Sequence, residues 1–180
     1  MTDFRAEKAI SIVEATEQDI PLLRDLTEQT FREAYSDSTD PASMEQHVQR
    51  NFRLEQIAAD FQLPATRFVL ARCADQWAGF LLLRTDHTHE LLAPARALYL
   101  HRIYVRRDFW RQRVGSALMQ YAIDAARQDQ YDWLWLVVWD QNQRAIDFYR
   151  RWGFEHFGYE MFQFGDEWTR DWAMRRAGHL

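Results

Sequence analysis

The stretch "DFWRQRVGSALMQYAIDAA", residues 108–126, decides how the fold is interpreted. Its apolar residues repeat at the three-and-four spacing of an amphipathic helix that begins near Val114. Two arginines, Arg111 and Arg113, stand just ahead of that helix, and the small residues Gly115 and Ser116 occupy its first turn. The first N–H groups of a helix have no partner within it and lie at its positive end. The stretch therefore predicts a site for a phosphate-bearing anion.

Local charge supports this interpretation. The segment 101–113 holds five arginines and one acid, which are Arg102, Arg106, Arg107, Arg111, Arg113 and Asp108. It carries +4 in a chain whose net charge is −5. A solvated surface run is the alternative explanation for such a cluster.

The strand before the helix has a phase change. In "LYLHRIYV" Leu98 and Leu100 fall on even positions, whereas Ile103 and Val105 fall on odd ones. One extra residue near His101 or Arg102 would place all four on the same face, and this predicts a β-bulge. The alternative is a strand buried on both faces, where parity carries no information.

Two further elements follow the helix. "WLWLVVW" (133–139) is a continuous apolar run typical of a buried strand. "DQNQRAIDFYRRWGF" (140–154) predicts a turn and a short helix, with Gly153 as a left-handed cap. Strand, helix, strand and helix in this order predict a βαβα unit.

The remaining segments extend this unit on both sides. Upstream we expect a strand at 10–13, a helix from Thr16 to about Tyr35, a second helical region at 42–61, an antiparallel hairpin of 66–73 and 76–84, and a polar loop at 85–97. Downstream, residues 154–176 predict two strands around a turn. The fold class is therefore α/β (α+β).

Composition limits the remaining possibilities. The 180 residues, 47% of them apolar, suffice for one core, so we expect a single domain over 1–180. The negative net charge argues against non-specific nucleic-acid binding. No apolar run approaches the roughly 20 residues of a membrane span, and the first residues lack a secretory signal. With Cys73 as its single cysteine and no internal disulfide, the protein is expected to be cytoplasmic, with no membrane partner.

The segments "RIYV", "RQRVGSAL" and "NQRAIDFYRRWGF" resemble the Gcn5-related N-acetyltransferase (GNAT) family, and within it the PaiA-like polyamine N-acetyltransferases. The resemblance implies a mixed sheet of about seven strands with flanking helices, and acetyl-CoA as cosubstrate. It places the pantetheine arm on main-chain groups of Ile103, Tyr104 and Val105. It assigns the pyrophosphate to the loop and first turn formed by Arg111, Gln112, Arg113, Val114, Gly115 and Ser116.

The loop departs from the family pattern at one position. Arg113 stands where the first glycine of the family loop usually falls. A non-glycine residue tolerates positive φ poorly, so the resemblance leaves open which backbone angles Arg113 adopts.

Chemistry requires three groups. A protonated amine must lose a proton before attack, and His101, directly or through water, is our hypothesis for the relay, although a structural strand histidine is the alternative. Relatives often use a glutamate that is absent here. We expect the N–H of Tyr104 to stabilise the oxyanion. The resemblance makes Tyr149 the acid for the departing thiolate, whereas packing in the core is its alternative. Asn142 would contact the cofactor arm or cap a helix.

The acceptor assignment rests on acids and one tyrosine. Glu33, Asp37 and Tyr99 are the expected substrate contacts, with Asp40, Asp166 and Glu167 as further acids that could hold a polyamine. Acids in turns are also ordinary surface. His87 and His89 are expected to be exposed loop residues, so no metal site is expected.

The sequence thus predicts acetyl transfer to a primary amine such as spermidine or spermine, by direct attack on the thioester. Acetylation of peptide N-termini or lysines is the first alternative. A non-catalytic CoA-binding sensor is the second. The expected partner is a small-molecule amine, and the protein is a monomer or homodimer.

Overall fold

The computed structural model describes residues 9–36, 40–164 and 167–179. Its strands are β1 (Ile10–Glu14), β2 (Thr66–Cys73), β3 (Gln76–Arg84), β4 (Ala97–Val105), β5 (Trp133–Val138), β6 (Glu155–Phe164) and β7 (Glu167–Ala177). Its α-helices are α1 (Ile20–Tyr35), α2 (Pro41–Asn51), α3 (Leu54–Gln62), α4 (Val114–Gln128) and α5 (Gln143–Arg151). Three short 3-10 helices are η1 (Glu17–Asp19), η2 (Glu90–Leu92) and η3 (Arg107–Phe109).

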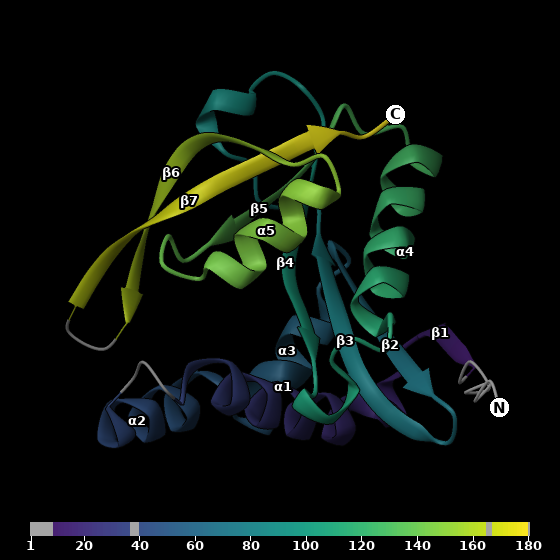
Figure 1. Ribbon diagram of the computed structural model, residues 1–180, viewed down its shortest axis with the longest axis vertical. Coiled ribbons are helices and arrows are strands. Elements are labelled where there is room, and N and C mark those ends of the chain that lie inside the picture. Colours follow the sequence, from purple (N-terminus) through teal and green to yellow (C-terminus); the bar gives the residue numbers. More distant parts are fainter. Residues whose placement is uncertain (1–8, 37–39, 165–166, 180) are drawn as a thin grey trace, which may run out of the picture.

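The strands form one sheet in the order β1-β2-β3-β4-β5-β7-β6 (Figure 1). β4 and β5 are parallel, and every other neighbouring pair is antiparallel. The predicted mixed sheet of seven strands, the βαβα unit, the hairpin of β2 and β3 and the final pair β6 and β7 are confirmed.

Helices cover the two faces of the sheet. α4 and α5 pack on one face through a cluster that includes Leu118 and Ile146. α1 and α3 pack on the other through Leu23 and Ile57. α2 belongs to this second side, where Met44 packs with residues of α1.

The predicted bulge lies in β4 at His101. Leu83 pairs with Leu100 and Leu82 with Arg102, so His101 is the extra residue. Leu98 and Leu100, before the bulge, and Ile103 and Val105, after it, all face the cluster beneath α4. The phase change in the sequence therefore marks the bulge correctly.

β4 and β5 pair over only three residues, Ala97–Tyr99 with Trp133–Trp135. Beyond Tyr99 the two strands diverge, and β5 continues to pair with β7 on its other side. Figure 1 shows α5 lying across the region where the strands separate. After the bulge, β4 therefore pairs with β3 on one side and with no strand on the other, among the described residues.

Two expected boundaries were wrong. The helical region expected at 42–61 is two helices, because the chain leaves helical geometry at Phe52, where φ is −119° and ψ is 32°. The loop expected at 85–97 contains η2, and His89 is buried within it. Gly153, with φ of 80°, has the predicted left-handed conformation after α5, and Cys73 is buried in β2.

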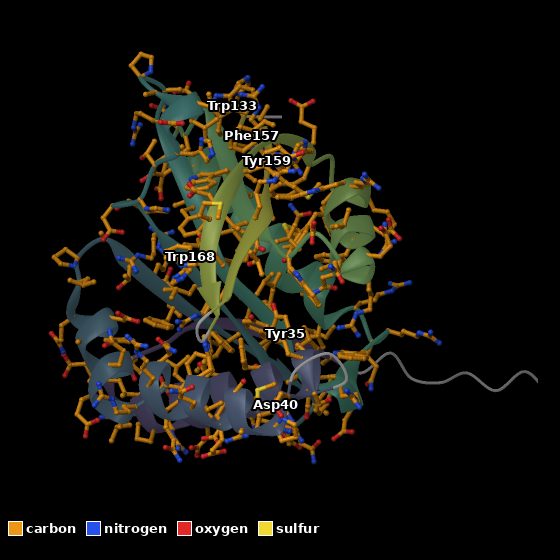
Figure 2. All side chains as sticks on the ribbon, turned by 90° about the vertical axis from the view of Figure 1, so that its left-hand side faces the viewer. Tyr35, Asp40, Trp133, Phe157, Tyr159 and Trp168 are labelled. Carbon is orange, nitrogen blue, oxygen red and sulfur yellow. The ribbon has the colours of Figure 1, made fainter. Side chains whose placement is uncertain are left out.

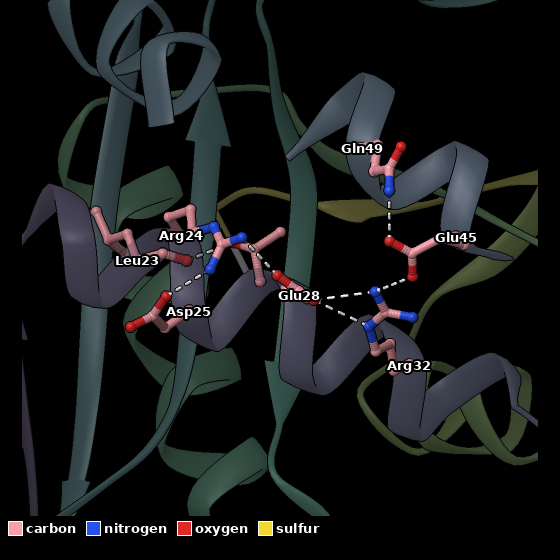
Figure 3. A network of polar contacts seen from close by, with 8 residues as sticks. Leu23, Arg24, Asp25, Glu28, Arg32, Glu45 and Gln49 are labelled. Carbon is pink, nitrogen blue, oxygen red and sulfur yellow. Dashed lines mark hydrogen bonds and ion pairs between the residues drawn. The ribbon is translucent and has the colours of Figure 1, made fainter. Parts of the chain in front are cut away.

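A polar network joins α1 to α2 (Figure 3). Arg32 bonds Glu28 on its own helix and reaches Glu45 of α2 with an Nη2–Oε2 distance of 2.7 Å. Gln49 donates to the other oxygen of Glu45 at 2.7 Å. Exposed ion pairs add little stability, so this network supplements the apolar packing of Met44 and Val48 against Phe31.

In the part of the chain that the structure describes, no helix combines the length and apolar character that crossing a bilayer requires.

Candidate active site

The turn before α4 has an unusual backbone. Arg111 and Arg113 adopt φ values of 62° and 65°, in the left-handed region. Arg113 is the N-cap of α4, and no side chain caps that helix end. The arginine thus takes the conformation that a glycine would hold at this position, at a cost of roughly 1–2 kcal/mol. The first N–H groups of α4 are left for a ligand.

Gly115 lies in the first turn of α4. A Cβ added there would meet Phe148 and Val105 side chains at 3.7 Å, which is ordinary contact distance. Packing within the protein therefore does not require a glycine at this position. Its missing side chain instead keeps the helix backbone accessible to a bound group.

Main-chain groups of β4 face the gap left by β5. The N–H of Arg106 bonds the carbonyl of Ala78 in β3 at 2.9 Å. Because hydrogen bonding alternates along an antiparallel pair, the N–H of Tyr104 also points to β3, and those of Ile103 and Val105 point to the gap. The expectation that Tyr104 supplies a free N–H was therefore wrong, since its pairing with Phe80 uses that group.

A cleft of about 570 Å³ opens beside this gap. Its walls come from the end of α1, from the loop after β4 and from the loop between β5 and α5. Its lining residues are Glu33, Ala34, Arg107, Trp110, Trp139, Gln141, Asn142, Gln143 and Arg144. Trp110 also fixes the end of β4, because its Nε1 donates to the Val105 carbonyl at 2.8 Å.

The arginines of segment 101–113 do not all gather here. Arg102 lies over the ring of Phe52, toward the second face of the sheet. Arg106 donates to the Trp77 carbonyl at 3.0 Å. The +4 cluster predicted from the sequence is therefore divided, and only part of it adjoins the cleft.

Arg144, from a different segment of the chain, is another arginine that lines the cleft. Arg144, at the start of α5, stacks on Trp110 with its guanidinium carbon 3.6 Å from the ring centroid. Burial, and then Arg107 nearby, lower its pKa. Sequence reasoning missed Arg144 because it lies some 30 residues beyond the basic segment.

Glu33 has a structural task. Its Oε2 accepts the main-chain N–H of Arg107 at 2.6 Å, and its carbonyl accepts Arg107 Nη2 at 2.7 Å. The carboxylate thus ties α1 to the loop after β4. The other oxygen, Oε1, accepts Gln29 Nε2 at 2.8 Å, so both oxygens of the carboxylate that the sequence assigned to the substrate already have partners within the protein.

Four tyrosines converge where β4 and β5 separate. Tyr35 donates a hydrogen bond to Tyr104, and the nearby Tyr104 and burial hold the pKa of Tyr35 well above its usual range. Tyr149 is buried on α5, where burial and then Tyr104 and Tyr99 raise its pKa. Tyr99 stacks on Trp135 with ring centroids 4.3 Å apart. Sequence reasoning missed Tyr35, which looks like an ordinary residue at the end of a helix.

His101 stacks on Tyr99, with ring centroids 5.3 Å apart. Its Nδ1 is buried and has no hydrogen-bond partner among the described residues. Burial and then Arg102 lower the pKa of His101 to about 3. The reason for choosing it, titration near neutrality, was therefore wrong.

Two other predicted residues cap helices, and three lie wholly or partly outside the described part of the chain. Asn142 caps α5 by accepting Ala145 N–H at 3.2 Å, and it also lines the cleft. Asp40 caps α2 by accepting Ser43 N–H at 2.9 Å. Asp37, Asp166 and the side chain of Glu167 lie outside the described residues.

His87 and His89 behave differently from each other. His87 is exposed, but His89 is only 4% exposed and accepts the Leu91 N–H at 3.1 Å, so its expected exposure was wrong. Across residues 9–36, 40–164 and 167–179, no three His, Cys, Asp or Glu side chains are grouped to hold a metal ion.

A known protein family matches most of the chain. Residues 21–154 match the family described as "Acetyltransferase (GNAT) family". A relative from Lactobacillus delbrueckii subsp. lactis, "Uncharacterized N-acetyltransferase in pepI 3'region", is 25% identical over 168 residues, which cover 93% of this chain and 97% of that one.

Two solved structures share the fold. The PaiA N-acetyltransferase from Thermoplasma acidophilum, in complex with coenzyme A, has a TM-score of 0.71 at 17% identity, covering 94% of this chain and 99% of that one. The ribosomal-protein-S18-alanine N-acetyltransferase from Escherichia coli has a TM-score of 0.69 at 18% identity, covering 96% of each chain. Because the family match extends over most of the chain, from α1 to the residue before β6, the protein belongs to the GNAT family of acetyltransferases.

Proposed function

We propose that this acetyltransferase transfers acetyl from acetyl-CoA to a primary amine of a small polycation such as spermidine or spermine. The family's acyl donor is acetyl-CoA. We place acetyl-CoA from one observation: β4 and β5 separate next to the N-terminus of α4, which has no side-chain cap. The separation offers main-chain groups for an extended amide arm, and the helix end offers N–H groups for a diphosphate.

The residues present fit the donor. N–H groups of Val114, Gly115 and Ser116 would hold the pyrophosphate, with Arg111 and Gln112 in the turn beside them. The missing side chain at Gly115 leaves room for its approach. Ile103 and Val105 would bond the pantetheine arm, although the Val105 carbonyl is already used by Trp110. Arg144 adds positive charge on the opposite wall of the cleft.

The reaction then needs little movement of protein groups. The amine nitrogen forms a bond to the thioester carbon while the carbon–sulfur bond breaks. A main-chain N–H of Ile103 or Val105 faces the negative charge that develops on the carbonyl oxygen. Tyr149 donates a proton to the departing sulfur, and its raised pKa keeps it protonated at neutral pH.

The amine must lose a proton in the same reaction. His101 is a poor final acceptor, because its pKa of about 3 lies roughly seven units below that of an alkylamine. Its neutral ring can still pass a proton to water through Nδ1, which has no partner among the described residues. We therefore retain His101 as a relay and not as the base.

A second acceptor class has its own support. The S18-alanine enzyme, which acts on a protein according to its name, shares the fold as fully as PaiA does. Arg113 adopts the left-handed conformation that glycine tolerates best, so its presence in the loop is weak support for a sensor without turnover.

Mass spectrometry decides between the acceptor classes. The protein is incubated with acetyl-CoA and, in parallel, with polyamines, monoamines and peptides bearing free N-termini. Spermidine or spermine gaining one acetyl group, with peptides unchanged, supports the proposal. Acetylated peptides alone favour the second class, and no product with any amine contradicts both.

A further inference from the structure

One buried carboxylate has no role in the site described so far. Asp171 of β7 is only 7% exposed. Its Oδ1 is buried and lacks a hydrogen-bond partner among the described residues. Thr169 donates a hydrogen bond to the carboxylate. A buried carboxylate oxygen left unpaired costs free energy, so a bound ligand that pairs with it would be favoured.

The register places Asp171 beside the active site. Trp172 pairs with Val138, the last residue of β5, so Asp171 lies one step further along, next to Trp139. Trp139 lines the cleft, and its ring centroid lies 6.3 Å from that of Tyr35. Asp171 is also close enough to Tyr35 to raise its pKa. The carboxylate therefore lies on the side of the cleft where the helices and the last two strands meet.

Figure 2 shows this side of the molecule. The pair β6 and β7 runs toward Tyr35 on α1 and Asp40 at the start of α2. Figure 1, which differs from this view by a 90° turn, also shows the pair extending toward the side of α2.

A second carboxylate stands across from the first. Glu160 of β6 is the direct cross-strand partner of Asp171, so both side chains lie on one face of the sheet. Like charges directly opposite each other are destabilising unless a cation lies between them. Glu160 Oε1 lies 3.9 Å from Nε2 of His89, whose Nδ1 accepts the Leu91 N–H, and no ion pair of Asp171 is found among the described side chains.

The surroundings of Asp171 suit an organic cation better than a metal ion. No group of three metal-ligating side chains includes Asp171 within the described ranges. Two aromatic residues, Tyr35 and Trp139, adjoin the site, and aromatic faces attract ammonium groups.

We propose that Asp171 binds an ammonium group of the acceptor, and that Glu160 binds a second one, so that the pair selects a di- or polyamine. This inference rests on the proposed function. It identifies an acceptor contact that the acids Glu33 and Asp40, already engaged elsewhere, do not provide.

Burial raises the pKa of Asp171, a hydrogen bond from Thr169 lowers it, and Asp140 raises it further. The titratable groups that face it are Tyr35 from α1, Asp140 from the loop after β5 and Glu160 from β6. An incoming ammonium group favours the charged carboxylate and offsets the cost of its burial.

The test is calorimetric titration of spermidine onto the protein–coenzyme A complex, which needs no turnover. We expect Asp171→Asn to weaken spermidine binding at least ten-fold, with coenzyme A affinity changed less than two-fold. The matched control is Asp75→Asn, which removes the same charge from a 98% exposed position in the β2–β3 turn. Glu160→Gln should weaken spermidine binding but leave butylamine binding unchanged.

The outcomes separate the two proposals. Unchanged spermidine binding in Asp171→Asn, or no binding to the wild type, overturns the role of Asp171. Binding that depends on Asp171 without any acetylated amine in the mass assay contradicts the proposed function alone. If Asp171→Asn does not fold, Asp171→Ser is titrated in its place, and the same ten-fold threshold applies.

Discussion

Glu33 Oε2 accepts the main-chain N–H of Arg107 at 2.6 Å, across 74 positions of sequence. This bond joins the end of α1 to the loop that precedes the phosphate turn. Through this carboxylate, α1 is connected to the proposed coenzyme A site.

Replacing Glu33 with alanine should loosen that loop. We expect coenzyme A affinity to fall about ten-fold, because a hydrogen bond to a charged group contributes roughly 1.5–3 kcal/mol. Calorimetry with coenzyme A measures the change. Glu55→Ala, on the exposed surface of α3, is the matched control and should bind normally. Equal affinities in the two variants would show that the bond does not organise the site.

We expect a glycine-to-alanine substitution to affect stability at Gly79 and coenzyme A binding at Gly115. At Gly79 an added Cβ would lie 2.3 Å from the Tyr104 carbonyl oxygen, so Gly79→Ala should lower the melting temperature sharply. At Gly115 the nearest contacts are 3.7 Å, so Gly115→Ala should keep the fold and weaken coenzyme A binding. Thermal unfolding and calorimetry together check both. A normal coenzyme A affinity in Gly115→Ala would contradict the phosphate site.

Arg113 offers a test of backbone strain. Arg113→Gly and Arg113→Ala remove the same charge, but alanine keeps a Cβ at φ of 65°. The glycine variant should therefore be more stable than the alanine variant by roughly 1 kcal/mol. Denaturant unfolding measures the difference. Equal stabilities would mean that the turn relaxes to a different conformation.

The elements of the fold could be predicted because each depends on local pattern. The parity change between Leu100 and Ile103 specified the bulge, and the periodicity after Val114 specified α4. The break at Phe52 could not be predicted, since the apolar spacing continues across it while the backbone turns.

The site was less accessible to sequence reasoning, because its residues are brought together by distant pairings. Tyr35, Arg144 and Asp171 have no distinguishing neighbours in sequence, and only the sheet order and the packing of α1 bring Arg144 into the cleft and the other two beside its Trp139 wall. The direction of the Tyr104 N–H likewise depends on pairing with β3, which an isolated strand does not reveal.

His101 should make the fold sensitive to acid. Its pKa is about 3 when folded and about 6.5 when unfolded, so the unfolded chain binds the extra proton first. The associated stability is complete above pH 6.5 and is lost as the pH falls toward 3. Between pH 6.5 and 5 the loss is about 2 kcal/mol, or roughly 4–8 °C in melting temperature.

His101→Asn should remove much of that acid sensitivity. Melting temperatures at pH 7 and pH 5 are compared for this variant, the wild type and the exposed control His156→Asn. A wild-type loss that persists unchanged in His101→Asn would show that His101 is charged in the folded protein, and the relay role would then need revision.

Tyr149 allows the acid role to be separated from packing. Its side chain contacts Phe148 and Phe154 in the cluster beneath α5, so phenylalanine preserves those contacts and removes the hydroxyl alone. With no phenol to protonate the departing sulfur, kcat should fall about 100-fold while coenzyme A affinity stays within two-fold. Steady-state kinetics with spermidine and calorimetry measure the two quantities.

The wild type should keep its activity up to about pH 10, because the raised pKa of Tyr149 holds the phenol protonated. Tyr121→Phe, which loses a hydroxyl bonded to Glu14 on the far side of α4, is the control. A Tyr149→Phe enzyme with unchanged kcat would leave the residue a packing role only, and the thiolate would then depart without a proton from the protein.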